Sequence, residues 1–493
     1  MTDASQTGAA ALVADPAAPP VREAIADPLP KAIAPPAPSP SPSRSPAAAA
    51  APLPASTAPF GDVLRRIASL AAPTSLIALL QAAGQLVETW LAARQGTAAL
   101  AGWAVVLPFA LLLQQMSTGA MGGGVVAAIA RALGAGKRED ASSLVLHAIL
   151  IAVAAGLAFA IALAGFPHAI LGAVGGETAA QAAATYAIWL FGAGAVPAWL
   201  ANTLASVLRG GGRHALAARV LASMWIVFPV LAWALAEPAG MGLAGIGASL
   251  ALVSWAAAIA MSVVVLRGGA GFVPVLRLRP SRALFWRILS VGLVACALAA
   301  VANLSTILVT AQLRDYGTAA VAAYGISARL EFLMIPLAFG VGSALTALVG
   351  RAVGAGDWDS ARRIAWVGAL VALAIAGSIG AAVGLAPMTF ARWFTSDAEV
   401  AAIAARALSW VAPAFGGFGL GMALYFASMG AGRMGYPIAA GLARIALAAG
   451  GGWVLAHVAG MGLDGHFLGV ALGITAYGAF TAMGVRRAVW SVR

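Results

Sequence analysis

The strongest constraint on this chain is an internal repeat. The segment 131–141 returns as 351–361, an offset of 220 positions, and each copy lies between two long apolar runs. The Gly-Xaa-Gly-Arg segment 210–213 returns at the same offset as 430–433, and Gly-Thr-Ala-Ala at 96–99 returns at 317–320. Three matches in the same order indicate two copies of one unit of roughly 220 residues.

The composition indicates a membrane protein. The chain is 61% hydrophobic and only 9% charged, with a mean hydropathy of +0.92, whereas soluble domains carry about 25% charged residues. The apolar runs are continuous and long enough to cross a bilayer as helices, which does not fit the alternating strands of a β-barrel. We therefore predict an all-α integral membrane protein with twelve transmembrane helices in two pseudo-symmetric six-helix lobes.

The two lobes are expected to have the same orientation, because each has an even number of spans. Parallel repeats of this kind are typical of transporters, with the substrate site between the halves near the middle of the membrane.

The net charge of +12 is distributed unevenly over the predicted loops. Most arginines, including Arg131, Arg351 and Arg444, are assigned to one side, while Arg94 and Arg406 belong to the opposite side. This is the positive-inside pattern, which predicts a multi-pass protein of the cytoplasmic membrane with both termini in the cytoplasm. The basic excess is thereby explained by topology, and we expect no nucleic-acid partner.

The chain is predicted to have four parts. Residues 1–61 are rich in proline and alanine and are expected to be a disordered cytoplasmic tail. Residues 62–270 form the N-terminal lobe, 271–282 a basic linker, and 283–493 the C-terminal lobe. The single cysteine, Cys296, excludes an intramolecular disulfide and a cysteine-based metal cluster.

Two acidic residues lie well inside predicted spans, Glu88 and Glu331. A carboxylate in the hydrocarbon region is costly, so such residues usually face a cavity and function there. We expect both to take part in ion coupling or substrate binding. The alternatives are that Glu88 reaches toward Arg94 at the surface, and that Glu331 forms a structural pair with Arg329, the one cation predicted to be deeply buried.

Four uncharged polar residues in the spans are candidates to line the cavity: Gln85, Gln114, Asn202 and Asn303. Hydrogen bonding between helices is the alternative role for each of them. The Gly-Ala-Gly segments do not fit the phosphate-binding P-loop, and no catalytic triad or zinc-protease motif is present. We therefore expect neither an enzyme nor a cofactor, and no metal apart from a coupling H⁺ or Na⁺, the latter near Glu88.

The ordered motifs resemble the multidrug and toxic compound extrusion (MATE) family from about residue 62 to the last span. They are Pro73 followed by Val87-Glu88-Thr89, then 96–101, 130–136 with its copy at 351–356, and the turns 210–213 and 430–433. The resemblance implies an antiporter that exports small organic, often cationic and amphipathic, compounds in exchange for Na⁺ or H⁺ by alternating access. It also implies that Glu88 occupies the place of the family's coupling carboxylate on the first helix, commonly an aspartate.

A flippase for lipid-linked substrates, from the wider superfamily, is the alternative function. Its cavity would have to be strongly cationic to hold a pyrophosphate group, and Arg329 is the one deeply buried cation expected here. Small-molecule substrates and membrane lipids are the expected partners, and the internal pairing of lobes makes a monomer sufficient.

Overall fold

The computed structural model describes residues 57–276 and 280–491. The predicted tail, apart from its last five residues, and residues 277–279 of the predicted linker lie outside this part of the chain. All regular structure in the described residues is helical.

The first half of the described chain contains eight α-helices and two π-helical turns. They are α1 (Phe60–Arg94), α2 (Thr97–Gln114), η1 (Gln115–Ala120), α3 (Met121–Gly134), α4 (Arg138–Gly165), α5 (Pro167–Ala187), η2 (Ile188–Ala193), α6 (Ala195–Gly210), α7 (His214–Ala236) and α8 (Gly242–Leu266).

The second half repeats this order with small variations. Its elements are α9 (Arg282–Gln312), η3 (Leu313–Tyr316), α10 (Thr318–Gly354), α11 (Trp358–Leu385), α12 (Pro387–Arg392), α13 (Ala398–Val411), η4 (Ala412–Ala414), α14 (Phe415–Ala431), α15 (Gly435–Ile445), η5 (Ala446–Gly451), α16 (Gly452–His457) and α17 (Leu463–Gly484).

Eleven of these helical stretches are long and apolar enough to cross a membrane, and a bent pair brings the number to twelve. The bent pair, Gln181–Ala193 and Ala195–Gly210, changes direction by 46°. The bend has two ordinary causes in the sequence, since the π-helical turn η2 precedes it and Pro197 follows it. The twelve-helix membrane fold predicted from the apolar runs is confirmed.

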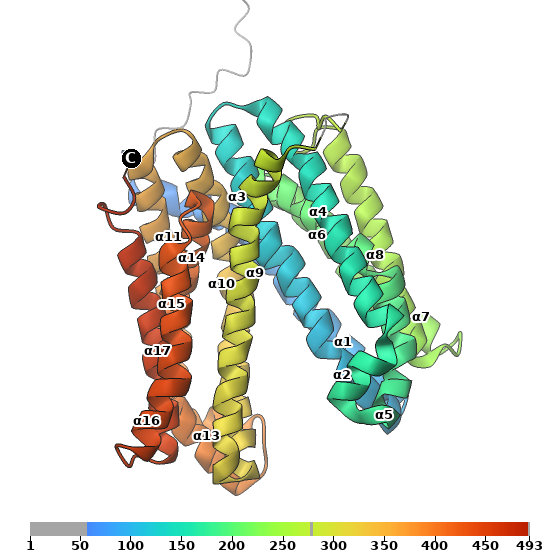
Figure 1. Cartoon of the computed structure of the whole chain (residues 1–493), viewed down its shortest axis with the longest axis vertical. Helices are drawn as coiled ribbons and strands as arrows, with labels where there is room; N and C mark the ends of the chain where they lie inside the picture. Colours follow the sequence, from blue (N-terminus) through green and yellow to red (C-terminus); the bar gives the residue numbers. More distant parts are fainter. Residues whose placement is uncertain (1–56, 277–279, 492–493) are drawn as a thin grey trace, which may run out of the picture. The chain divides into compact units, whose positions relative to one another are not determined.

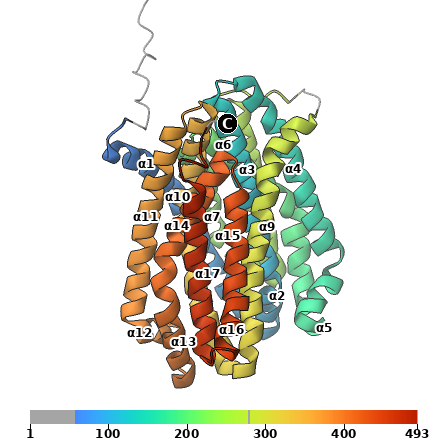
Figure 2. The same cartoon turned by 60° about the vertical axis from the view of Figure 1, so that its left-hand side comes forward.

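The helices of each half pack mainly with one another. In the second half α10 contacts α11, α13 and α14, and α17 contacts α14 and α15; this group is drawn in yellow to red in Figure 1. Figure 2 shows α9, α15 and α17 side by side, in agreement with the contacts of α15 with both neighbours. In the first half α4 contacts α6, and α8 contacts α6 and α7, while α1 contacts both α7 and α10 and so touches both groups.

The two halves meet at the end of the helices that carries most of the arginines, here called the arginine-rich end. Gly134 at the end of α3 lies so close to α10 that a Cβ there would overlap the carbonyl oxygen of Arg351. Gly354 lies in the same way against the carbonyl oxygen of Arg131. The Arg131 guanidinium also donates to the Gly430 carbonyl at 2.9 Å. The repeated segments of the sequence are therefore among the segments through which the two halves touch, together with the contacts of α1 with α10 and of α3 with α9.

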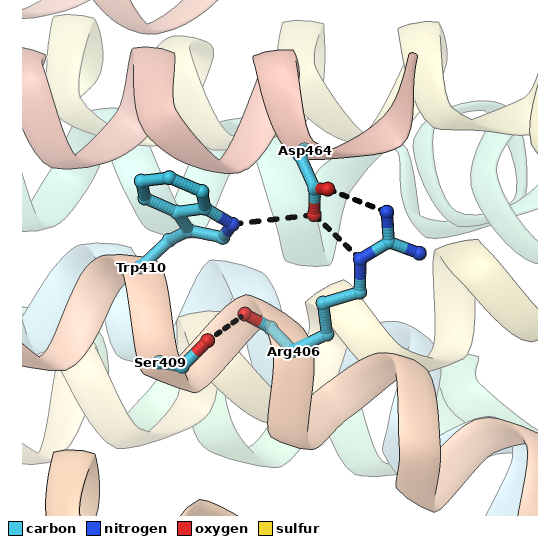
Figure 3. A network of polar contacts seen from close by, with 4 residues as sticks. All are labelled: Arg406, Ser409, Trp410 and Asp464. Atoms are coloured by element: carbon cyan, nitrogen blue, oxygen red, sulfur yellow. Dashed lines mark hydrogen bonds and ion pairs between the residues drawn. The ribbon is translucent and has the colours of Figure 1, made fainter. Parts of the chain in front are cut away.

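Ion pairs tie helices together at the opposite end. Figure 3 shows Asp464, at the start of α17, accepting hydrogen bonds from the Arg406 guanidinium and, at 3.2 Å, from Trp410 Nε1, both on α13. In the first half Arg94 Nε donates to Glu237 at 2.7 Å. This hydrogen bond lowers the pKa of Glu237, which follows α7, below its ordinary value. That pairing stabilises the fold above the ordinary pKa of a glutamate, and the contribution is lost as the pH falls through the lowered value.

Candidate functional site

An open cavity of about 800 Å³, a volume that includes the solvent space at its mouth, lies within the first half. Its walls come from α1, α2, α5, η2, α6, α7 and α8, so all the residues that line it belong to one lobe. The polar or charged residues that line it are Gln81, Gln85, Glu88, Gln114, Tyr186, Asn202, Trp225 and Ser254; its other lining residues are apolar. Glu88 is the one charged residue among those that line it, which makes the cavity acidic.

Glu88 sits near the end of α1 with its side chain turned into the lobe, and only 6% of the residue is exposed. Trp103 of α2 donates its Nε1–H to Glu88 Oε1 at 3.0 Å, and the Tyr186 hydroxyl of α5 donates to the same oxygen. Neither donor is charged, so the buried carboxyl has hydrogen bonds without a neutralising cation in these contacts. The alternative that Glu88 reaches toward Arg94 is wrong, because Arg94 pairs with Glu237 instead.

Gln114 and Asn202 belong to one hydrogen-bond network on the cavity wall. The Gln114 amide donates to Thr118 Oγ1 at 3.0 Å and to Gln81 Oε1 at 3.3 Å. The Asn202 amide donates to Ser117 Oγ at 2.9 Å. Ser117 and Thr118 lie in the π-helical turn η1, a type of turn found frequently at functional sites. The network gives the cavity amide and hydroxyl groups that are able to meet a substrate.

Gln85 and Asn303 differ in position. Gln85 lines the cavity one helical turn before Glu88, and its carbonyl oxygen accepts the Thr89 hydroxyl at 2.7 Å. Asn303 lies on α9 of the second half and donates to the Ala299 carbonyl at 2.9 Å and to Gln115 Oε1 at 3.4 Å. Asn303 therefore bridges the halves beside the turn η1. The other three candidates, Gln85, Gln114 and Asn202, line the same cavity as Glu88.

Glu331 lies in a separate site within the second half. Its carboxylate is paired with the guanidinium of Arg444 on α15. The Glu331 side chain is 7% exposed and the Arg444 side chain 12%. The Arg444 guanidinium also lies over the rings of Phe418 and Tyr477, at 5.4 Å and 6.0 Å from their centroids. Aromatic faces attract a cation of this kind, so Arg444 is held from several sides.

Two predictions about cations are corrected by these positions. Arg329 was expected to be buried and to be the partner of Glu331, but it is exposed on α10. Residues two apart on a helix point in different directions, so a buried Glu331 leaves Arg329 on another face. Arg444 was assigned to the arginine-rich loops, but it lies inside the lobe. The signal was available, since Arg444 falls eight residues inside the apolar run 436–458, which predicts a span.

Sequence reasoning also missed the partners of Glu88. Tyr186 lies 98 residues after Glu88, and Trp103 lies 15 residues after it on the next helix. Nothing in their local sequence marks them as hydrogen-bond donors to a carboxylate. In residues 57–276 and 280–491 no group of three or more histidine, cysteine, aspartate or glutamate side chains is arranged to hold a metal ion.

The MatE family model matches the chain twice, over residues 73–234 and 293–454. The two matches together cover about two thirds of the chain, one in each half. The chain belongs to the MATE family. It is therefore a multi-pass membrane transporter, and the resemblance seen in the ordered motifs is confirmed.

Solved structures of MATE transporters share the fold. A MATE transporter of Vibrio cholerae, VcmN in its bent form, has a TM-score of 0.80 at 21% identity over 87% of this chain and 98% of its own. A MOP superfamily transporter from Pyrococcus furiosus, described as having a binding pocket of reversed polarity, has a TM-score of 0.80 at 19% identity over 88% of this chain and 97% of its own.

A multidrug resistance MATE transporter in an outward-facing conformation is equally similar, with a TM-score of 0.80 at 20% identity over 87% of this chain and 96% of its own. At these identities the likeness concerns the fold. Comparison with curated protein sequences gives no match.

Proposed function

We propose that this MATE transporter is a secondary antiporter that exports small cationic, amphipathic organic compounds across the cytoplasmic membrane in exchange for protons. The observation that carries the proposal is the cavity in the first lobe, which is mainly apolar and whose one charged lining residue is the buried Glu88. Such a cavity accommodates an apolar molecule and attracts a positive charge on it.

Exchange of a proton for a substrate molecule follows if the proton and the substrate cation compete for Glu88. Tyr186 and Trp103 both donate to Oε1, which leaves Oε2 to carry a proton or to meet a cation. Protonation removes the negative charge that holds a cationic substrate, so proton entry from outside promotes substrate release. Removal of the proton on the cytoplasmic side restores the charge for the next substrate molecule.

The choice of a proton over Na⁺ rests on the groups around the carboxyl. A hard cation such as Na⁺ is bound by several oxygen atoms, each of which offers a lone pair to the ion. The Trp103 and Tyr186 side chains donate hydrogen bonds to Glu88, and the Trp103 indole is a donor only. These contacts support a carboxyl group that gains and loses a proton.

The contact of the halves at the arginine-rich end supports an arrangement open toward the other side of the membrane. With the arginine-rich end in the cytoplasm, as the positive-inside rule predicts, the described conformation would be closed to the cytoplasm. Alternation would then require the contacts of Gly134 and Gly354 to separate.

Efflux of ethidium from cells lacking their own exporters tests the proposal. We expect energy-dependent efflux by the wild type, collapse of efflux by a protonophore, no dependence on Na⁺, and loss of efflux in Glu88→Gln. Glu237→Gln, which also removes a carboxylate but lies at the surface, should keep efflux. Full efflux by well-expressed Glu88→Gln would overturn the coupling role, and efflux that follows the Na⁺ gradient would identify the other ion.

The flippase alternative receives less support from the same cavity. A lipid-linked pyrophosphate needs cationic side chains around it, whereas the residues that line this cavity include no arginine or lysine. Arg444, which lies inside the other half, is neutralised by Glu331.

A further inference from the structure

Arg209 is a buried cation that the proposed exchange does not use. It lies in the last turn of α6, and only 2% of the residue is exposed. Its Nε and Nη1 atoms are enclosed and have no hydrogen-bond partner in the described part of the chain. A nearby buried nitrogen, His214 Nε2 at the start of α7, also has no partner there, while His214 Nδ1 faces the Thr74 hydroxyl at 3.2 Å.

The charge of Arg209 has no carboxylate to balance it among the described residues. Glu88 and Glu331 are the buried carboxylates of residues 57–276 and 280–491. Neither is paired with Arg209, because Glu88 accepts hydrogen bonds from Trp103 and Tyr186, and Glu331 is paired with Arg444. Arginine stays protonated in proteins, so it cannot escape the cost of burial by losing its proton. An uncompensated buried charge is strongly destabilising.

Two features soften this cost without removing it. The guanidinium of Arg209 lies over the ring of Phe339, with its Cζ 5.7 Å from the centroid, and the C-terminal end of α6 has partial negative charge. Neither supplies an acceptor for the enclosed Nε–H and Nη1–H groups. The missing partner is therefore an acceptor that carries negative charge.

We propose that Arg209 is the centre of an anion-binding site, which takes a small monovalent anion such as chloride or a carboxylate group. The site lies where the halves meet, because Phe339 belongs to α10 of the second half. It also continues the polar face of the cavity wall, since Asn202 lies seven residues before Arg209 on α6. Seven residues are two helical turns, so both lie on the same face, roughly 10 Å apart along the helix.

The position in the repeat supplies a matched variant. The residue 220 positions after Arg209 is Met429, which packs at the corresponding end of α14. Arg209→Met thus gives the first half the residue that the second half already accommodates. Arg213→Met removes one arginine from an exposed position on the same turn and serves as the control for net charge.

The test is the thermal unfolding of the purified full chain in lipid nanodiscs at constant ionic strength, with chloride or acetate replacing the bulky anion gluconate. We expect a saturable rise in the midpoint temperature of a few degrees for the wild type and for Arg213→Met, because a ligand bound only to the folded state stabilises it. Arg209→Met should lose this dependence.

The two probes distinguish the source of the anion. A response to chloride indicates an inorganic counter-ion, and a response to acetate alone indicates the carboxylate group of an organic molecule. If Arg209→Met does not fold, Arg209→Lys, which keeps the charge and loses the planar guanidinium, should show a weaker response than the wild type. A wild type without any anion response, or equal responses in the wild type and Arg209→Met, would overturn the proposal.

Discussion

The guanidinium of Arg444 lies against the carboxylate of Glu331 in the interior of the second lobe. This pair gives the two lobes different electrostatics, although they are copies of one unit. Glu88 in the first lobe is held by two neutral donors, whereas Glu331 is neutralised by a cation. The carboxylate of Glu331 already has a cation as its partner, so we expect Glu88 to be the carboxyl that exchanges protons during transport.

The Glu331–Arg444 pair should behave as a structural unit. Arg444→Met leaves the Glu331 charge buried without a partner, which we expect to lower the free energy of unfolding by about 3–5 kcal/mol. The double variant Glu331→Gln/Arg444→Met removes both charges and should be destabilised by less than the sum of the single variants. Denaturation of detergent-solubilised protein, followed by tryptophan fluorescence, measures these differences. A destabilisation of the double variant equal to the sum of the two single variants would show that the two side chains do not stabilise each other.

Removal of the Tyr186 hydroxyl should change how efflux depends on pH. Tyr186→Phe keeps the ring in place and removes one of the two hydrogen bonds to Glu88 Oε1. A hydrogen bond to a charged group contributes about 1.5–3 kcal/mol, and its loss favours the protonated carboxyl. We therefore expect the pH at which efflux is half-maximal to rise by about one to two units, since each 1.4 kcal/mol is a tenfold change in an equilibrium.

Ethidium efflux at a series of external pH values measures this shift. Tyr316→Phe, a change of the same size in the second lobe, is the matched control and should keep the wild-type profile. An unchanged profile in Tyr186→Phe, together with normal expression, would show that the hydroxyl does not influence the proton exchange of Glu88.

The fold was predictable because it depends on patterns that can be read from a single sequence. Apolar runs longer than the bilayer identify the spans, and the motif at 131–141 and 351–361 identifies the repeat. The structure adds a physical reason for the persistence of that motif. Glycine at 134 and 354 allows the main chains of the two halves to approach at the arginine-rich end.

The site was only partly predictable, because its contacts join residues that lie on different helices. Glu88 was found since a carboxylate stands out in an apolar span. Tyr186 and Trp103 do not stand out, because aromatic residues are common in membrane helices and serve most often in packing. Arg444 was misassigned because a charge-counting rule places arginines in loops, and only the three-dimensional packing reveals a partner such as Glu331.

The network of Arg406, Trp410 and Asp464 should contribute little to stability. The Arg406 and Asp464 side chains are 55% and 22% exposed, and exposed ion pairs typically contribute less than about 1 kcal/mol. Asp464→Asn also keeps an oxygen able to accept from Trp410. We expect a midpoint of unfolding close to that of the wild type and unchanged efflux. A large loss of stability would show that this contact between α13 and α17 is essential to the second lobe.

The glycines at the contact between the halves should control the conformational cycle. A Cβ at Gly134 or Gly354 would overlap a carbonyl oxygen of the opposite repeat, and a main-chain atom cannot move aside as a flexible side chain can. Gly134→Ala and Gly354→Ala should therefore separate the halves at the arginine-rich end and reduce efflux at least tenfold, since closure at that end is needed in each cycle.

Gly325→Ala is the control expected to transport normally. Gly325 lies on α10, as Gly354 does, and a Cβ there meets no atom within 4 Å. Spin-label distances between positions 137 and 357 on the two repeats should lengthen in Gly134→Ala and Gly354→Ala and stay at the wild-type value in Gly325→Ala. Wild-type distances in all three variants would mean that the halves tolerate the added methyl group and that closure does not depend on these glycines.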